Sequence, residues 1–297
     1  MRFRNNENLR LKQKTIKSVI QWSLFILGAV VLAVCMRIFI FATYSIPTPS
    51  MEPAIMSGDH VVVNKLVPGP RVIMNFFSLG KGEKPVFRRF AGWKVKRDDV
   101  LIFNFPYSNW ERIDMNLSLF YAKRCVAIPG DTLCIENGFY KVKGVTDTLG
   151  HYDNQRRLSE RQDNKFAPAI FHCFPYDPRY NWNIKNFGPV YIPEKGATIA
   201  IDSLNVMIYR NLIAYETGER VSLNNEIVSL GDSSITEYTF NKNYYFMSGD
   251  YVFDSRDSRY WGLLPEDHIT GKVSFVWNSK DIHTGKIRWN RFLKKIK

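Results

Sequence analysis

The amino-acid sequence predicts a mainly β domain that follows a single membrane-spanning helix. Residues 18–36 carry no charge and are almost entirely apolar. After residue 43 the chain holds several short β-branched runs separated by Gly, Pro and Asn turns, and amphipathic helical patterns are hard to find there. These three observations favour a β-sheet or β-barrel domain that an N-terminal helix holds at a membrane.

The apolar segment SVIQWSLFILGAVVLAVCMRIFIF (18–41) is long enough to cross a bilayer, which needs about 20 such residues in a helix. Arg37 lies near its far end, where a long basic side chain can reach the interface. A cleaved signal peptide would have an apolar region of about 7–15 residues and a small-x-small cut site. This run is longer and no clean site of that kind follows it. We therefore predict a retained anchor over residues 18–42, with no second span downstream.

The formal net charge of +13 is concentrated at the two ends of the chain. Residues 1–17 carry a net charge of +5 and residues 284–297 a net charge of +6, so little is left for the folded region. A nucleic-acid-binding domain is expected to carry a basic face, and this distribution therefore argues against a nucleic-acid partner. Under the positive-inside rule the N-terminal tail lies in the cytoplasm and the domain lies outside it.

The segment YSIPTPSMEPAI (44–55) places a serine among three prolines. Pro47, Pro49 and Pro53 forbid a helix, because each fixes φ and lacks an N–H. The residue before each proline is pushed toward extended geometry. We therefore expect Ser50 to lie on a stiff, extended segment directly after the anchor.

The predicted strands are short and are bounded by turn residues. They cover residues 59–66, 98–105, 121–128 and 272–277, and Asn137-Gly138 joins two further short runs as a hairpin. Residues 145–240 are less patterned and rich in Asn, Asp, Tyr and Arg. We interpret them as an insertion or second lobe on the β core, facing either the substrate or the membrane.

The C-terminal segment 284–297 combines its basic residues with Trp289 and Phe292. Such a segment either lies on anionic lipid or forms a solvated tail, and the pattern favours neither. Of the four cysteines, Cys35 lies in the anchor.

The other three cysteines, Cys125, Cys134 and Cys173, would face an oxidising compartment, where one pair could be bridged. The sequence leaves that pairing open. No Cys or His spacing suggests zinc, and the five histidines form no ligand pair. We therefore predict neither a metal site nor a cofactor.

A base is needed before the hydroxyl of Ser50 can act as a good nucleophile. None of the five histidines lies in a recognisable triad motif. A lysine can act instead if burial keeps it neutral. Lys123 shares a strand face with Tyr121 and Cys125, so it could point inward. A lysine in a strand is more often solvent-facing, and the pattern alone leaves its role open.

Four further segments stand out in order along the chain, namely SIPTPSMEPAI (45–55), RDDVLIFNFP (97–106), YAKRCVAIPGDTL (121–133) and SGDYVFDSRDSRYWGLLPEDHITGK (248–272). Together they make up roughly a fifth of the chain, and in this order they resemble the sequence boxes of the type I signal peptidases. The family consists of membrane-anchored Ser–Lys proteases that remove signal peptides from exported proteins. The resemblance therefore implies a signal-peptidase-like β domain with a serine endopeptidase site.

The resemblance also assigns the catalytic roles. It implies that Ser50 is the acyl-forming nucleophile and Lys123 its general base, with the Ser50 N–H and the Thr48 hydroxyl as oxyanion donors. Pro49 stands where the family has glycine. The proline stiffens the loop, and the family's oxyanion hole needs no N–H donor from this position. The segment YVFD (251–254) replaces the family's NRxN, so the hydrogen bonding of that loop is expected to differ.

Further residues have supporting roles by the same resemblance. Ser255 corresponds to a serine that orients the lysine, and Asp257, Arg259 and Arg124 to residues that brace it. For the last three we favour a purely structural salt-bridge network over a direct chemical role. Residues expected to line the substrate site or to bury the lysine are Met51, Tyr121, Phe246 and Met247, of which the last two could be ordinary core.

The implied function is cleavage of signal peptides at the outer face of the cytoplasmic membrane. The partners would be the lipid bilayer and membrane-tethered preproteins with small residues before the cut site. The predicted regions are a cytoplasmic tail (1–17), an anchor (18–42), an extracytoplasmic catalytic domain (43–283, with the lobe at about 145–240) and a basic C-terminal tail (284–297). The alternative is an anchored, non-catalytic β domain that binds or assembles other proteins. A soluble self-cleaving repressor is disfavoured by the anchor.

Overall fold

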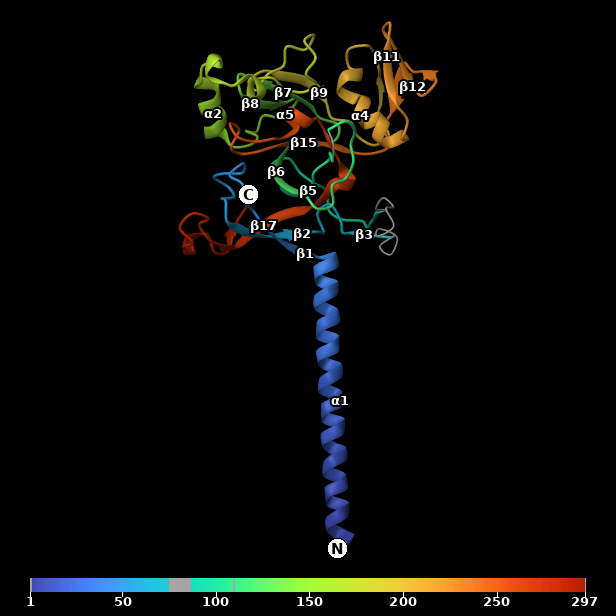
Figure 1. Ribbon diagram of the computed structural model, residues 1–297, viewed down its shortest axis with the longest axis vertical. Coiled ribbons are helices and arrows are strands. Elements are labelled where there is room, and N and C mark those ends of the chain that lie inside the picture. Colours follow the sequence, from blue (N-terminus) through green and yellow to red (C-terminus); the bar gives the residue numbers. More distant parts are fainter. Residues whose placement is uncertain (1, 75–86, 109, 297) are drawn as a thin grey trace.

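The computed structural model describes residues 2–74, 87–108 and 110–296, with side chains from residue 14 onward except that of Phe87. Helix α1 (Arg2–Phe39) projects from the domain as a long rod (Figure 1). Its residues Lys14–Phe39 form the one helix in the described chain that is long and apolar enough to cross a membrane. At 1.5 Å per residue these 26 residues span roughly 39 Å, so the predicted N-terminal apolar helix is confirmed.

The junction between α1 and the domain is closed by a lysine. Lys65 Nζ donates hydrogen bonds to the carbonyl oxygens of Arg37 and Ile38, at 2.8 and 3.2 Å. A cation at this end of a helix satisfies carbonyl groups that have no intrahelical partner and complements the helix dipole. The helix is therefore joined to the end of the second strand rather than through a free linker.

One curled antiparallel sheet forms the centre of the domain, with the strand order β1-β2-β17-β5-β6-β15-β16 and with β18 added to β17. Its strands are β1 (Phe41–Ser45), β2 (Asp59–Asn64), β5 (Val100–Asn104), β6 (Phe120–Ala127), β15 (Tyr244–Ser248), β16 (Leu264–Pro265), β17 (Ile269–Ser279) and β18 (Lys294–Lys295). Strand β17 changes register by bulges against both β2 and β5, which lets it bend across the sheet. The predicted mainly β fold is confirmed.

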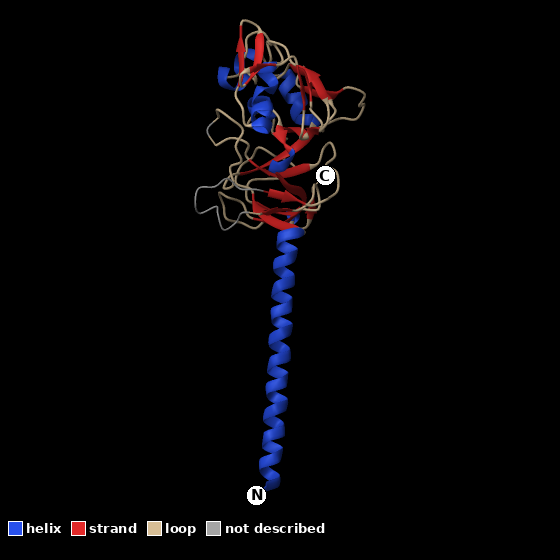
Figure 2. Cartoon of the chain, turned by 90° about the vertical axis from the view of Figure 1, so that its right-hand side faces the viewer, coloured by secondary structure: helices blue, strands red, loops and turns tan. Residues whose placement is uncertain are grey.

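The chain between β6 and β15 lies at the end of the domain far from α1 (Figures 1 and 2). Its strands are β7 (Thr132–Glu136), β8 (Phe139–Val142), β9 (Phe187–Tyr191), β10 (Thr198–Ala200), β11 (Val221–Asn224), β12 (Ile227–Leu230), β13 (Ser233–Ser234) and β14 (Glu237–Thr239). Its helices are α2 (Tyr152–Glu160), α3 (Pro168–Phe171), α4 (Val206–Thr217) and the 3-10 turn η2 (Asp163–Lys165). The expectation that residues 145–240 form a lobe facing the substrate or the membrane stays a prediction.

Helices α2 and α4 are elements that the sequence patterns did not indicate. Five residues of α4 are buried, and the helix ends at Gly218, whose φ of 76° is left-handed. Smaller elements complete the fold, namely β3 (Arg71–Ile73), β4 (Phe87–Arg89), α5 (Ser258–Trp261), η3 (Glu266–His268) and η4 (Trp289–Arg291).

Two apolar clusters lie on opposite faces of β5 and β6. Val100 and Ile102 belong to the smaller cluster, whereas Leu101 and Phe103 belong to the larger one. Every residue of β5 is buried, which explains the uninterrupted apolar run VLIF. Because directly opposite residues of paired strands share a face, the pairing of Leu101 with Lys123 places the lysine on a buried side of the sheet.

The C-terminal segment, predicted as a basic tail, is folded against β2. Arg291 forms a buried ion pair with Asp59, with Nη2 at 2.5 Å from Oδ2, and Ile296 is also buried. Burial by itself raises the pKa of Asp59, but hydrogen bonds from Arg291, Ser279 and the Met56 N–H lower it below its usual value. The pair thus ties the last turn of the chain to the strand that follows the serine segment.

We predict that Arg291→Met lowers the free energy of unfolding by about 3–5 kcal/mol, because it leaves the Asp59 carboxylate buried without its partner. Thermal unfolding in detergent measures the loss. The exposed Lys286 provides a matched control, and Lys286→Met should change little. Because the folded pKa of Asp59 is lowered, the wild-type advantage should be full above about pH 4 and fade below it. Equal stabilities of the two variants at pH 7 would contradict this prediction.

Candidate active site

Ser50 lies in a tight turn between β1 and β2. Glu52 N–H donates to the Pro49 carbonyl at 2.8 Å, and Met51 and Ile55 are buried in the smaller cluster. As predicted, the prolines exclude a helix, but residues 50–54 form turns instead of the extended segment that we expected. Backbone hydrogen bonds close this turn, since the Ile55 N–H also donates to the Met51 carbonyl at 2.9 Å.

Lys123 reaches this turn from β6. Its Nζ lies 2.5 Å from Ser50 Oγ, and the residue is only 3% exposed. Burial lowers the pKa of Lys123 to about 8, while the charges of Asp257 and Arg259 raise and lower it, respectively. The general expectation of a solvent-facing strand lysine is therefore wrong here. A substantial fraction of the amine is neutral near pH 8 and able to accept a proton.

The Thr48 hydroxyl lies beside the serine. Its Oγ1 is 3.5 Å from Ser50 Oγ, across the intervening Pro49. This is the outer limit of a hydrogen bond, so the contact constrains Ser50 weakly. The contact brings the two hydroxyls together, and the oxyanion role of Thr48 stays a prediction.

The loop after β15 packs directly against the serine turn. Tyr251 N–H donates to the Ser50 carbonyl at 3.1 Å. A Cβ atom placed on Gly249 would come within 2.5 Å of the Ser50 carbonyl oxygen and within 2.2 Å of Ser255 Oγ. Only glycine permits this close approach of the two backbones. The predicted partner of the lysine, Ser255, is buried, but its Oγ makes no hydrogen bond to Lys123 in the described structure.

Two buried ion pairs hold this loop. Arg259 donates to both oxygens of Asp257, at 2.9 and 2.8 Å, and neither residue is exposed. Burial raises the pKa of Asp257, but the Arg259 charge and hydrogen bonds lower it below its usual value. Arg124 binds Asp250 in a bidentate pair with both contacts at 2.7 Å. These residues contact one another and the loop backbone, and none of them hydrogen-bonds the Ser50 hydroxyl in the described structure.

A groove of about 310 Å³ opens at Ser50 and Lys123. Met51 and Tyr121 line it, as predicted, together with Tyr44 and Phe120. Further lining residues that the sequence patterns did not indicate are Asp254 and Arg256. The predicted wall residues Phe246 and Met247 are fully buried in the larger cluster and do not line the groove. They are core residues, which is the second of the two readings that the sequence left open.

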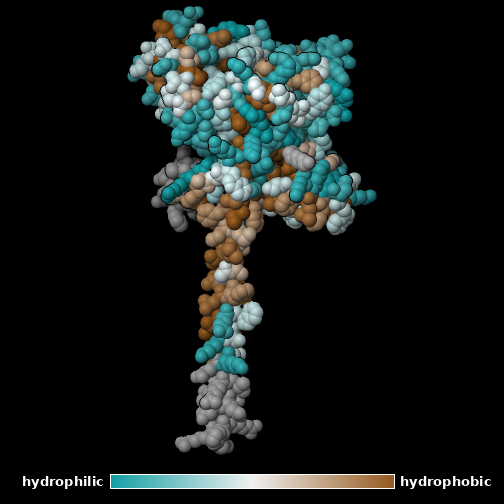
Figure 3. All heavy atoms as spheres, turned by 180° about the vertical axis from the view of Figure 1, so that it is seen from behind, coloured by the Kyte–Doolittle hydropathy of each residue, from teal (hydrophilic) through white to brown (hydrophobic). Residues whose placement is uncertain are grey.

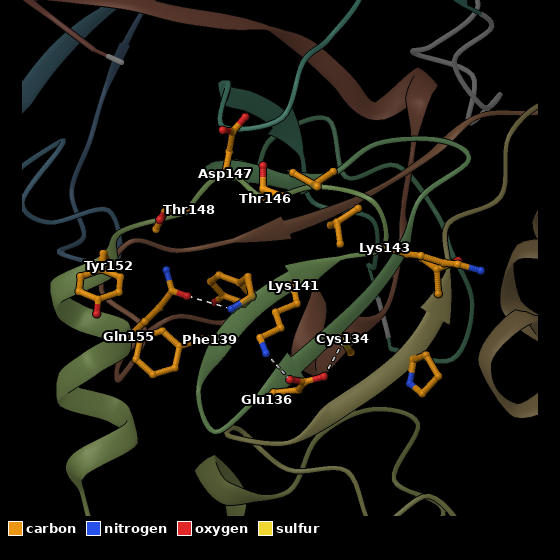
Figure 4. Close-up of a pocket in the computed structure, with 15 residues that line it drawn as sticks. Cys134, Glu136, Phe139, Lys141, Lys143, Thr146, Asp147, Thr148, Tyr152 and Gln155 are labelled. Carbon is orange, nitrogen blue, oxygen red and sulfur yellow. Dashed lines mark hydrogen bonds and ion pairs between the residues drawn. The ribbon is translucent and has the colours of Figure 1, made fainter.

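Larger hollows lie elsewhere on the domain. One of about 740 Å³ is bounded by β7, β8 and α2, where Glu136 pairs with Lys141 (Figure 4). Another, of about 1110 Å³, adjoins α4. Neither hollow contains Ser50 or Lys123, so the volume of a cavity does not identify the candidate active site.

No group of His, Cys, Asp and Glu within the described ranges is arranged to hold a metal ion. All four cysteines are free thiols, so none of the pairings left open by the sequence is present. The most buried histidine, His268, has its pKa lowered by burial to about 4 and contacts the Asn104 carbonyl instead of the serine.

A serine hydroxyl beside a buried lysine amine, on a β domain that follows an apolar helix, is the arrangement expected of a membrane-anchored serine peptidase. Residues 19–278 match the family described as "Signal peptidase, peptidase S26", and the chain belongs to that family. It is 27% identical to signal peptidase I of Buchnera aphidicola subsp. Schizaphis graminum over 248 residues, covering 82% of this chain and 70% of the relative. The predicted recognition and enzyme class are thus confirmed.

Other relatives carry the same name. Signal peptidase I of Haemophilus influenzae is 26% identical over 283 residues, covering 93% of this chain and 74% of the relative. That of Helicobacter pylori strain 26695 is 23% identical over 300 residues, covering 95% of each chain. A solved signal peptidase I from Enterococcus faecalis is 17% identical, with a TM-score of 0.30 over 61% of this chain and 97% of that one.

We predict that Lys123→Met stabilises the fold at neutral pH. The folded state holds the pKa of Lys123 at about 8, against an ordinary value of 10.5, so it disfavours the protonated amine. The resulting penalty is about 3 kcal/mol below pH 8 and vanishes as the pH rises toward 10.5. Unfolding temperatures of the full chain in detergent from pH 7 to 11 should therefore converge for wild type and variant. A constant difference over this range would show that burial of the charged amine is not the cause.

Proposed function

We propose that this enzyme removes signal peptides from exported preproteins, with Ser50 as nucleophile and Lys123 as general base. The observation that carries the proposal is the 2.5 Å contact between the buried Lys123 Nζ and Ser50 Oγ at the base of a groove. Family membership and the shared name of its relatives supply the substrate class.

The reaction follows from the properties of the two groups. Neutral Lys123 accepts the hydroxyl proton as Ser50 Oγ attacks the scissile carbonyl carbon, and negative charge develops on the carbonyl oxygen. The Ser50 N–H and the Thr48 hydroxyl stabilise that charge, and a donor of this kind is typically worth about 3 kcal/mol. The Lys123 ammonium then protonates the leaving amine as the peptide bond breaks. Water, deprotonated by the same amine, hydrolyses the acyl-enzyme and restores Ser50.

The groove accounts for the substrate geometry. It runs between the β1–β2 connection and the start of β6, beside Tyr44 and Phe120. An extended peptide binds along such a groove by forming hydrogen bonds with the exposed backbone of the protein, while its alternate side chains enter pockets in the groove wall. A hollow of about 310 Å³ shared by several residues of substrate leaves room for small side chains before the cut site.

Ser50→Ala and Lys123→Ala should each abolish cleavage of a preprotein by the purified full-length protein in detergent, because each removes one partner of the proton transfer. The exposed Lys143 gives a matched lysine control, and Lys143→Ala should cleave like wild type. Cleavage is followed by the size of the mature product, and folding by thermal unfolding. Full activity of either site variant would reject the pair. An inactive wild type would favour the non-catalytic alternative.

We further propose that the N-terminal tail is cytoplasmic and that the catalytic domain rests on the outer face of the cytoplasmic membrane. The charge of the tail supports this orientation. The apolar surface of the domain gathers at the end adjoining α1 (Figure 3). Exposed apolar side chains near that end are Phe39, Ile40, Phe41, Phe90 and Trp93, and toward the C-terminus Ile282, Ile287, Trp289 and Phe292. A substrate held in the same membrane would meet the groove at a high effective concentration.

The C-terminal segment should touch lipid. Trp289 is 74% exposed and lies among basic residues, a combination that suits an anionic interface. In anionic vesicles that contain lipids brominated near the headgroup, Trp289→Phe should remove quenchable fluorescence from the reconstituted full chain. Trp110→Phe is the control, since Trp110 is also exposed but lies beside α4. Equal quenching losses for both variants would favour a solvated segment.

A further inference from the structure

Helix α2 lies outside the four segments that resemble the family, yet one of its side chains touches the catalytic loops. Asn154 is buried, with 4% of its surface exposed. Its Nδ2 donates to the Asp250 carbonyl at 2.7 Å and to the Glu52 carbonyl at 3.3 Å. A carboxamide nitrogen has two hydrogens, so both are used. The two carbonyls belong to the turn that carries Ser50 and to the loop that follows β15.

Both carbonyls are close to the proposed reacting pair. Glu52 follows Ser50 by two residues within the same turn. The carboxylate of Asp250 holds Arg124, which is the neighbour of Lys123 on β6. The amide of Asn154 therefore connects the backbone next to the nucleophile with the loop whose side chain fixes the strand next to the base. The contact from Tyr251 N–H to the Ser50 carbonyl is a second link between the same two segments.

The helix itself is held independently of these loops. Gln155, the neighbour of Asn154, accepts the Tyr140 N–H at 2.9 Å and donates to the Leu149 carbonyl at 2.7 Å. Figure 4 shows the Gln155 side chain directed from α2 to the strand beside it. Leu158 adds a fully buried apolar contact. Asn154 is thus presented to the catalytic loops from a helix docked on β8, which is a rigid base for a positioning contact.

We propose that Asn154 is a positioning residue for the Ser50–Lys123 pair. Its amide fixes the distance between the serine turn and the loop after β15, and so holds the hydroxyl at the amine and excludes water from the amine. The inference rests on the proposed roles of Ser50 and Lys123. It assigns to the segment between β8 and β9 a direct part in the geometry of the site.

The test compares kinetics of preprotein cleavage by Asn154→Asp, Asn154→Ala and Asn154→Gln with those of wild type. The aspartate has the same shape but presents oxygens to two carbonyl oxygens, and alanine leaves both carbonyls without a donor. We expect kcat to fall about 10- to 100-fold in both, as for a displacement of reacting groups by about 1 Å, with KM changed less than about 3-fold. Asn154→Gln keeps both donors and should recover part of the rate.

The pH profile separates positioning from stability. In wild type the rate should rise with pH as Lys123 loses its proton, with an apparent pKa of about 8. Water admitted beside Lys123 would restore part of its hydration and raise its pKa. The increase of the cleavage rate with pH should therefore occur at higher pH in Asn154→Ala than in wild type.

Gln155→Leu is the matched control, because it removes an equally buried amide from the same helix without touching either catalytic loop. It should lower the unfolding temperature and leave kcat and the pH dependence of the cleavage rate close to those of wild type. All kinetics are measured below the unfolding temperature of each variant.

The inference is overturned if both the aspartate and alanine variants keep the wild-type kcat and the wild-type pH dependence of the cleavage rate. It is equally overturned if Gln155→Leu shows the same loss and the same shift, since the effect would then be a general loosening of α2. Ser50→Ala and Lys123→Ala measured in parallel distinguish this failure from failure of the proposed function. Activity that survives those two substitutions rejects the pair itself, whereas activity that depends on them and ignores Asn154 rejects only the positioning role.

Discussion

The burial of the Lys123 amine against the Ser50 hydroxyl is the constraint on which the rest of the site depends. Charged ammonium groups are poorly tolerated away from water, so the structure around this one must favour its neutral form. Strand β5 provides Leu101 opposite the lysine, with an apolar cluster on each face of the strand pair. The ion pair of Asp257 with Arg259 acts on the lysine with opposite signs, so desolvation remains the largest influence on its pKa.

The loop after β15 converts that burial into a defined geometry. Gly249 allows the loop backbone to approach the Ser50 carbonyl, and Asp257 accepts the Gly249 N–H at 3.0 Å. Arg124 anchors the next residue of the loop from the strand that carries the lysine. A serine turn on one segment and a lysine on another are therefore fixed through a third segment. Removing one member of either buried ion pair would leave an uncompensated charge inside this assembly, which couples the stability of the loop to its role in the site.

The sequence predicted the parts of the structure that local patterns determine. The apolar helix, the strand predicted at 98–105 and the strand that carries Lys123 follow from composition and periodicity, and the resemblance of four short segments indicated the serine and lysine. Contacts between distant segments were not predictable. The partner of Arg124, the core position of Phe246 and the bridge made by Asn154 depend on which segments meet in space. The turn at Ser50 was read as extended because the prolines exclude a helix without specifying how Met51 and Ile55 reach the core.

The same desolvation explains why a lysine suits the proposed role of general base at this site better than the more usual histidine. A general base works best when its pKa lies near the pH at which the enzyme operates. Burial lowers the pKa of any cationic base, so a histidine, whose ordinary pKa is about 6.5, becomes too weak a base. His268 of this chain illustrates the effect, since burial lowers its pKa to about 4. A lysine whose pKa falls from 10.5 to about 8 instead has a pKa close to neutral pH. A dry pocket therefore selects the stronger base, and the apolar β core that gives the domain its stability also makes the amine at position 123 competent to accept a proton.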